Sequence, residues 1–146
     1  GAPLSEDVDR WSLVANDLCR QATTQGRIVL RSAGLQHRDF VAMADVVAAT
    51  AFMATIPDES LTHDVYNLAS GESVSIRSLA GLVQESYAEV FGRDVPLEAP
   101  DPAASETEQP LKVDTSRMQE AGFRREGDLK GELRQTLELC KRAFGR

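Results

Sequence analysis

The chain turns, extends and then enters a helix within residues 34–46, which read GLQHRDFVAMADV. A turn at residues 32–34 precedes an extended segment, residues 38–41, which leads into a helix expected from about Ala42 to Ile56. This helix is apolar on nearly every face, and a helix of that kind is normally buried on every face. Its only charged residue is Asp45, which lies in the first turn, where a carboxylate complements the helix dipole.

Periodicity on either side of this stretch predicts helices alternating with short strands. Apolar residues recur at helical spacing over residues 9–25, 76–91 and 128–144, and a short helix is expected to begin at Asp114 or Thr115. Strands are expected over residues 27–31, 38–41, 65–69 and 95–98. About five helices with four or five short strands indicate an α/β fold. These strands are too few and too short to form a complete doubly wound sheet.

Residues that commonly begin or end helices support these helix limits. Gly26 and Gly92 follow the first and third helices, where a glycine commonly ends a helix. Ser75 precedes the third helix and is a suitable N-cap.

Composition excludes several classes of function. The chain has 146 residues and a formal charge of -7, so the broad positive field that favours nucleic acid or anionic lipid is absent. No run of 18 apolar residues occurs, which argues against a membrane span, and the N-terminal sequence does not resemble a signal peptide. We therefore expect a cytoplasmic protein.

The cysteines and histidines have no metal-binding pattern. Cys19 and Cys140 each fall on the apolar stripe of an expected helix, which favours two buried free thiols in a reducing compartment. The two histidines, His37 and His63, lack metal-ligand spacing, so we expect no metal site.

No catalytic constellation is present in the residues themselves. The glycines do not fall in the spacing of a dinucleotide-binding or phosphate-binding loop. Arg38 is the side chain of most interest, because it stands directly before the most apolar helix. Its guanidinium suits bidentate recognition of phosphate, and the alternative is a structural ion pair with Asp39 or Asp45. Position alone leaves these two interpretations open.

Four blocks resemble the extended short-chain dehydrogenase/reductases, the NAD-dependent epimerase/dehydratase family. Residues 34–46 are similar to the family's G-x-Q-x-R-D-F-[IV]-x-V-x-D-V block, and residues 65–71, VYNLASG, to its V-Y-N-L-G-S-G strand and turn. Residues 113–117, VDTSR, followed by AGF at 121–123, resemble D-T-S-K…L-G-[WF]. A closing amphipathic helix completes the match. The opening residues 1–3 resemble those just after the family's N-x-Y-G element.

This resemblance implies that residues 1–146 are a single substrate-binding domain, the C-terminal part of a Rossmann-type epimerase/dehydratase without its nucleotide-binding half. The intact parent would bind NAD or NADP and transfer hydride at a sugar carbon. The glycine-rich loop and the Y-x-x-x-K pair would lie upstream, since Tyr66 is followed four residues on by Ser70 and Tyr87 by Phe91. We therefore expect this chain to contain no catalytic and no cofactor-binding residues, and to be inactive alone.

The resemblance also implies a substrate, a sugar nucleotide or a related small molecule. Arg38 matches the family arginine that contacts the nucleotide phosphates, and Asn16 falls near an asparagine that faces the substrate. Asp39 and Asp45 match family aspartates that we interpret as structural. The four expected substrate-binding residues are Arg38, Asn16, Arg31 and Lys112.

The sequence departs from the family at two of these positions. Arg31 stands where many members have an aromatic residue that stacks on the base. The loop at residues 101–109, which often carries a second phosphate-binding arginine, has no basic residue, so that Lys112 is the nearest cation.

Two alternatives remain. The chain could be a non-catalytic binding or interaction module derived from the same family, or an RNA-binding relative, against which its acidic balance argues. A part of a larger fold also carries apolar residues that its own core does not cover. The helix over residues 42–56 is such a feature, and we expect it to drive self-association.

Overall fold

The computed structural model describes residues 10–145, so Asp9 and the opening residues 1–3 lie outside the described residues. The predicted alternation of helices and short strands is confirmed. In chain order the elements are α1 (Val14–Gln25), β1 (Ile28–Val29), β2 (His37–Asp39), α2 (Met43–Thr55), a 3-10 turn η1 (Asp58–Ser60), β3 (Ser73–Ser75), α3 (Ile76–Phe91), β4 (Leu97–Glu98), α4 (Ser116–Glu120) and α5 (Leu129–Phe144).

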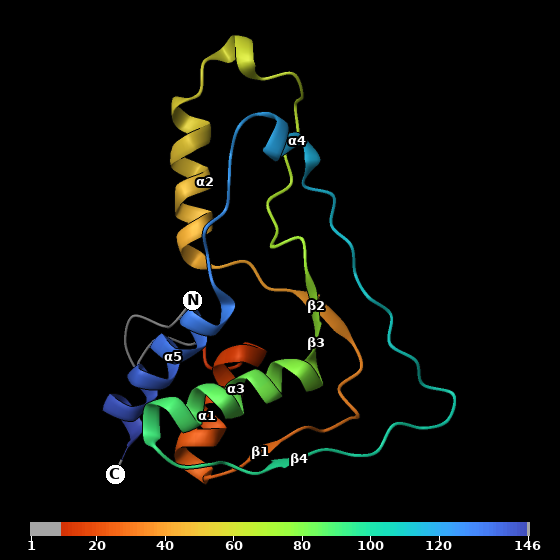
Figure 1. The fold of residues 1–146 in the computed structure, drawn as a ribbon, viewed down its shortest axis with the longest axis vertical. Helices are drawn as coiled ribbons and strands as arrows, with labels where there is room; N and C mark the ends of the chain where they lie inside the picture. Colours follow the sequence, from red (N-terminus) through yellow and green to blue (C-terminus); the bar gives the residue numbers. More distant parts are fainter. Residues whose placement is uncertain (1–9, 146) are drawn as a thin grey trace.

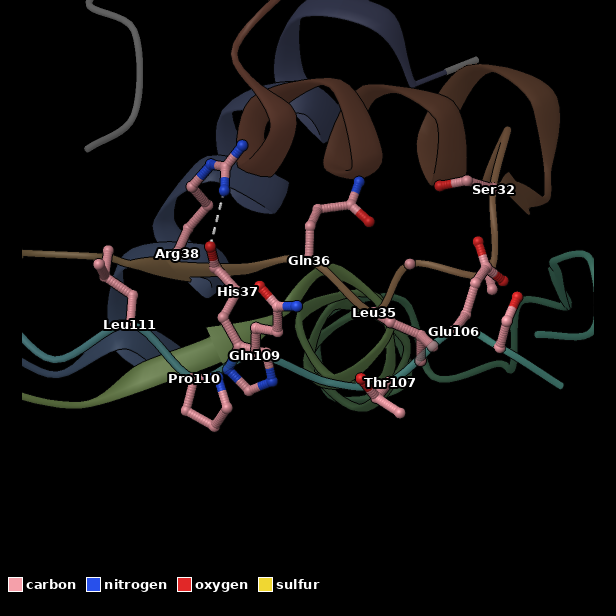
Figure 2. Close-up of a pocket in the computed structure, with 13 residues that line it drawn as sticks. Ser32, Leu35, Gln36, His37, Arg38, Glu106, Thr107, Gln109, Pro110 and Leu111 are labelled. Atoms are coloured by element: carbon pink, nitrogen blue, oxygen red, sulfur yellow. Dashed lines mark hydrogen bonds between the residues drawn. The ribbon is translucent and has the colours of Figure 1, made fainter. Parts of the chain in front are cut away.

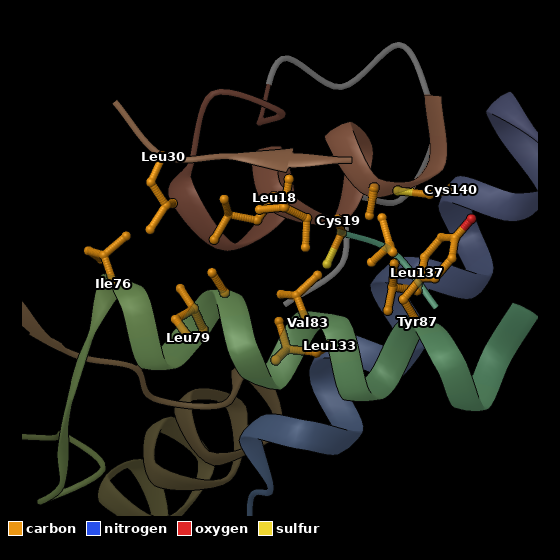
Figure 3. Close-up of a cluster of buried hydrophobic side chains, with 14 of the residues drawn as sticks. Leu18, Cys19, Leu30, Ile76, Leu79, Val83, Tyr87, Leu133, Leu137 and Cys140 are labelled. Carbon is orange, nitrogen blue, oxygen red and sulfur yellow. The ribbon is translucent and has the colours of Figure 1, made fainter. Parts of the chain in front are cut away.

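Three helices, α1, α3 and α5, pack together and enclose the main hydrophobic core (Figures 1 and 3). Each contributes one apolar stripe, as helical spacing predicts. The buried residues of these stripes include Leu18, Cys19 and Ala22 from α1, Leu79, Val83 and Tyr87 from α3, and Leu133, Leu137 and Cys140 from α5.

The two cysteines are free and buried, as the sequence predicts. Burial raises the pKa of the Cys140 thiol to about 11. Burial, and then the neighbouring Cys140, also raises the pKa of the Cys19 thiol well above its ordinary value. Both side chains are therefore unreactive thiols that fill the core.

The ends of these helices follow from local residues. Gly26 and Gly92 adopt the left-handed conformation, with φ of 65° and 68°, directly after α1 and α3. The Ser75 hydroxyl accepts a hydrogen bond from the Ser78 amide at 3.1 Å and caps α3. The Asp128 carboxylate accepts from the amides of Lys130 and Gly131 and caps α5.

Four short strands form two separate pairs. Parallel β1 and β4 bring Ile28 opposite Leu97 beside the helical core. Antiparallel β2 and β3 pair His37 with Ser75 and Asp39 with Ser73. The second pair lies between the core helices and α2, so it fixes the position of the segment that contains Arg38 (Figure 1).

The expectation that α2 is buried on every face is wrong for this chain. Only Asp45 and Ala49 are buried, while 53% of Met43 and 63% of Val47 are exposed. The helix stands away from the three-helix core (Figure 1). It packs through one face only, on a small cluster formed by Ala49, Phe52, Met53, Tyr66, Leu68, Met118 and Phe123.

The strand expected over residues 65–69 is not formed. The segment runs beside α4 without a ladder partner within residues 10–145. Side chains bind it instead: the Arg117 guanidinium donates to the Val65 carbonyl at 3.3 Å, and the Asn67 amide donates to the Asp114 carbonyl at 3.1 Å. A β-rich composition gives a strand only where a neighbouring strand can share its backbone hydrogen bonds.

A long irregular segment, residues 99–115, connects β4 to α4 along one edge of the molecule (Figure 1). It begins where β4 ends and passes beside residues 32–38, with which it lines one cavity. It returns to the small cluster through α4, whose N-cap is Thr115, as predicted. This path forms one wall of the candidate site.

Candidate functional site

The largest described cavity, of about 670 Å³, lies between two irregular segments (Figure 2). Residues 32–38 form one wall and residues 105–111 the other. Arg38 is the only Lys or Arg among the described lining residues, and Glu106 is the only Asp or Glu. The remaining polar lining consists of hydroxyl, amide and imidazole side chains together with backbone.

Gly34 shapes the first wall. Its φ of 75° is one that side-chain-bearing residues rarely adopt. A Cβ at this position would lie 2.9 Å from the Arg77 amide nitrogen and 2.9 Å from Leu30 Cδ1. The glycine therefore lets the chain turn closely over the start of α3, and the Arg77 amide donates to the Gly34 carbonyl at 2.9 Å.

Arg77 ties the two walls together, which the sequence did not indicate. Its Nε donates to the Ala33 carbonyl at 2.9 Å, and its Nη2 donates to the Pro100 carbonyl at 2.7 Å. Ala33 lies in the first wall, and Pro100 lies near the start of the segment that forms the second. These partners are 44 and 23 residues away in sequence, so no local pattern could have identified the contact.

Arg38 lies at the edge of the cavity and is exposed. Its Nη1 donates to the carbonyl of its own neighbour, His37, at 2.8 Å (Figure 2). Because this single bond is local, the surroundings of Arg38 do not hold its side chain firmly. Within residues 10–145 it forms no ion pair with a carboxylate.

The two aspartates proposed as ion-pair partners of Arg38 are engaged elsewhere. Asp39 accepts hydrogen bonds from the amides of Ser70 and Gly71, at 2.7 and 2.9 Å. Asp45 is buried and accepts from the amides of Glu126 and Gly127 through one oxygen, both at 2.9 Å. Both carboxylates thus bind backbone amides in turns, and neither forms the structural ion pair with Arg38 that the sequence left open.

His37 connects the strand pair to the second wall. Its Nδ1 lies 3.1 Å from the Ser73 hydroxyl, and its Nε2 lies 3.5 Å from Glu108 Oε2 without hydrogen-bond geometry. An isolated bridge pairs Gln36 with Gln109 at the same level. The bridge between Gln36 and Gln109 therefore joins the second wall to the first, and His37 and Glu108 lie close together beside it.

The other expected substrate-binding residues do not line this cavity. Asn16 is 4% exposed and donates through its side-chain amide to the Arg10 carbonyl at 3.0 Å, so its contact is structural. Arg31 and Lys112 are exposed. They stand directly before Ser32 and directly after Leu111, two lining residues at the outer ends of the walls.

The described residues do not fit a bound dinucleotide. A dinucleotide diphosphate is normally held by free backbone amides where a glycine-rich loop enters a helix. Here the N-terminus of α3 is capped by Ser75, that of α5 carries the Asp128 carboxylate, and the first turn of α2 carries Asp45. Within residues 10–145, no three His, Cys, Asp or Glu side chains are grouped to hold a metal ion.

Comparison with known proteins gives a family match over part of the chain. The sequence profile of the NAD dependent epimerase/dehydratase family matches residues 9–69. The family resemblance is confirmed. The matched region includes the first wall of the cavity, with Arg38, and the whole of α2.

Solved structures of this kind share the fold. RMD from Pseudomonas aeruginosa, in complex with NADPH, aligns with a TM-score of 0.68 at 22% identity over 92% of this chain. UDP-N-acetylglucosamine 4-epimerase from Methanobrevibacter ruminantium, in complex with UDP-N-acetylmuramic acid, gives 0.64 at 22% over 95%. L-threonine 3-dehydrogenase from Trypanosoma brucei gives 0.65 at 20% over 89%.

The chain spans less than half the length of these proteins. It covers 44%, 42% and 40% of the three, respectively. The fold is therefore that of one part of a Rossmann-type epimerase/dehydratase. Among the residues described here, no helix is long and apolar enough to cross a membrane.

Proposed function

We propose that residues 1–146 form the substrate-binding portion of an NAD(P)-dependent sugar-nucleotide epimerase/dehydratase, and that the cavity beside Arg38 receives the diphosphate and sugar. The observation that carries this proposal is the state of Arg38. Its guanidinium lines a cavity of about 670 Å³, and within residues 10–145 no carboxylate neutralises it. A guanidinium in that state is suited to bind a phosphate through paired hydrogen bonds.

The lining of the cavity suits the remainder of such a ligand. Hydroxyls of Ser32, Ser105 and Thr107, and amides of Gln36 and Gln109, offer both donors and acceptors. Sugar hydroxyl groups require partners of this kind. Arg31 and Lys112 stand at the outer ends of the two walls, and we propose that they add positive charge around a bound nucleotide.

We propose that the cofactor chemistry takes place outside this chain. NAD or NADP would be bound by another part of the parent protein, together with the tyrosine and lysine of the Y-x-x-x-K pair. The chain alone would then bind substrate without converting it. The relatives named above support this class of reaction.

Calorimetric titration with UDP and with uridine tests the role of Arg38. UDP is expected to bind more tightly than uridine, and Arg38→Ala should weaken UDP binding by about 1.5–3 kcal/mol without changing uridine binding. Arg27→Ala removes an exposed arginine that pairs with Glu98 at 3.7 Å and serves as the matched control. Equal affinities for UDP and uridine would remove Arg38 from a phosphate site.

A non-catalytic binding module is the second candidate, since the cavity beside Arg38 needs no cofactor in order to hold an anion. An antibody against this chain distinguishes the two in an immunoblot of the native source. A band of about twice the size of this chain supports the enzyme. A band that matches this chain supports a binding module without NAD(P) chemistry.

We place either form in the cytoplasm, since both cysteines are free thiols.

Self-association is the third part of the proposal. The exposed face of α2 carries Met43 and Val47 without a charged neighbour on the helix apart from buried Asp45. An apolar surface of this kind is normally covered by protein. We propose that a second copy covers it when the chain is alone in solution.

A further inference from the structure

A second cavity, of about 340 Å³, lies between α4 and residues 67–70. The walls are residues 67–70 on one side, and α4 with the residues after it, up to Arg125, on the other. None of its described lining residues lines the cavity beside Arg38. The two sites can therefore be tested separately.

Two consecutive arginines, Arg124 and Arg125, line this second cavity. The Nη1 of Arg124 donates to the carbonyl oxygens of Gln119 and Phe123, at 2.6 and 2.9 Å. The Nη1 of Arg125 donates to the Gly127 carbonyl at 2.9 Å. Each guanidinium is thus held by one nitrogen, and its Nε and Nη2 have no hydrogen-bond partner within residues 10–145.

In the part of the chain that the structure describes, neither of these arginines is paired with a carboxylate, although Arg125 also borders a neighbouring cavity whose lining includes Glu72 and Asp128. Within the described residues, neither Arg124 nor Arg125 forms an ion pair, whereas Arg20, Arg27 and Arg134 each pair with a carboxylate. No Asp or Glu is among the described lining residues of the cavity. In a chain with 23 acidic and 16 basic residues, two adjacent arginines without carboxylate partners make a local site for an anion.

The floor of the cavity is apolar. Ala69, Met118 and Phe123 line it and are 9%, 5% and 8% exposed. Small-molecule sites combine such surface with a few polar groups in cavities of roughly 300–1,000 Å³. A ligand that fills this one therefore has an anionic end and a compact apolar end.

We propose that this second cavity binds a phosphate monoester of a small apolar group, with the phosphate on Arg124 and Arg125 and the apolar group on Met118 and Phe123. A phosphate offers three oxygens to the four free nitrogens of the two guanidinium groups, and a carboxylate offers two. The site is independent of the proposed function, because it shares no described lining residue with the cavity of Arg38.

Phenyl phosphate, inorganic phosphate and benzoate are the probes, titrated into the isotope-labelled chain at constant ionic strength and followed by amide NMR shifts. Phenyl phosphate is expected to give saturable shifts at Gln119, Phe123 and Arg124. It should bind several-fold more tightly than inorganic phosphate, which gains nothing from the apolar floor. It should also bind more tightly than benzoate, which lacks the third oxygen.

Variants then assign the site. Arg125→Gln is expected to weaken phenyl phosphate binding by at least about tenfold. Arg124→Lys keeps the positive charge but loses the paired N–H donors of the guanidinium. It should weaken phosphate binding without unfolding the turn that follows α4. Arg27→Gln is the matched control, since Arg27 pairs with Glu98 at 3.7 Å and does not line the cavity. Arg38→Ala should leave these shifts unchanged, whether or not Arg38 binds nucleotide.

The proposal is overturned by any of three results. Shifts that do not saturate, or that occur only at residues 32–38, would show that the second cavity takes no phosphate. An unchanged affinity in Arg125→Gln, with the fold intact, would show that the arginines do not bind it. Equal binding of benzoate and phenyl phosphate would make the ligand a carboxylate and contradict the phosphate assignment.

Discussion

Arg77 and Pro100 are joined by a 2.7 Å hydrogen bond from the guanidinium Nη2 to the proline carbonyl oxygen. The same guanidinium donates through Nε to the Ala33 carbonyl. One side chain at the start of α3 thus sets the separation of the two walls of the candidate site.

Arg77→Ala is expected to lower the free energy of unfolding by about 1–3 kcal/mol, because two carbonyl oxygens lose their donor and Ala33 is buried. Urea denaturation followed by circular dichroism measures the change. Arg77→Lys keeps the positive charge, but its ammonium group can donate to only one of the two carbonyl oxygens at a time. Its loss of stability should therefore be intermediate. An Arg77→Ala midpoint equal to that of the wild type would mean that the walls do not depend on this side chain.

Glu108→Gln is expected to loosen the second wall, because it removes the charge that faces His37 at 3.5 Å. Glu108 is 54% exposed, so the pair is worth at most about 1 kcal/mol. Amide exchange over residues 103–111 should therefore rise by up to about fivefold, measured by mass spectrometry. Asp101→Asn, in the same segment, controls for the loss of a negative charge. An equal rise in both variants would argue against a specific contact.

Gly127→Ala is expected to destabilise the chain by about 1–3 kcal/mol through overpacking. A Cβ at this position would collide with Ala42 Cβ and Asp45 Oδ2, and would separate the Gly127 amide from Asp45. Gly81→Ala is the control of opposite sign. Gly81 lies within α3 with no atom near its missing Cβ, so alanine should stabilise by about 0.5–1 kcal/mol. Thermal melts of the two variants should move in opposite directions.

Val47→Lys tests self-association through α2. Val47 is 63% exposed, so a lysine there costs the monomer little, yet it places a charge in any apolar contact made by this face. Sedimentation velocity is expected to show oligomers of the wild-type chain and monomers of the variant. Thr50→Lys, an exposed change on the same helix, probes how far the contact extends. A wild-type chain that stays monomeric at high concentration would rule out this interface.

Stability is expected to fall as the pH rises from 9 to 11. The pKa of Cys140 is raised from 9.0 to about 11 in the folded chain. Above pH 9 the thiol of the unfolded chain therefore ionises first, which lowers the free energy of the unfolded state relative to the folded one. The cost is up to about 1.4 kcal/mol for each pH unit for one such group. Cys140→Ala should reduce this slope in urea titrations at several pH values, and the raised pKa of Cys19 should account for part of what remains. The same slope in both proteins would assign the loss to other groups.

The sequence by itself determined the helical core. Periodicity placed α1, α3 and α5, and Gly26, Ser75 and Gly92 marked three of their ends, because a cap or an apolar stripe depends on residues only a few positions apart. The family blocks likewise indicated the epimerase/dehydratase part of the fold, since such blocks are short and contiguous.

Only the tertiary structure decided which partners these residues meet. Arg38 is without a carboxylate because Asp39 binds amides about 31 residues away and Asp45 binds amides 81 and 82 residues away. The β-rich segment at 65–69 stays unpaired, and α2 stays exposed, because strand pairing and burial require surfaces from elsewhere in the chain. Local sequence specifies what a segment can form, whereas its neighbours in space decide whether that form is completed.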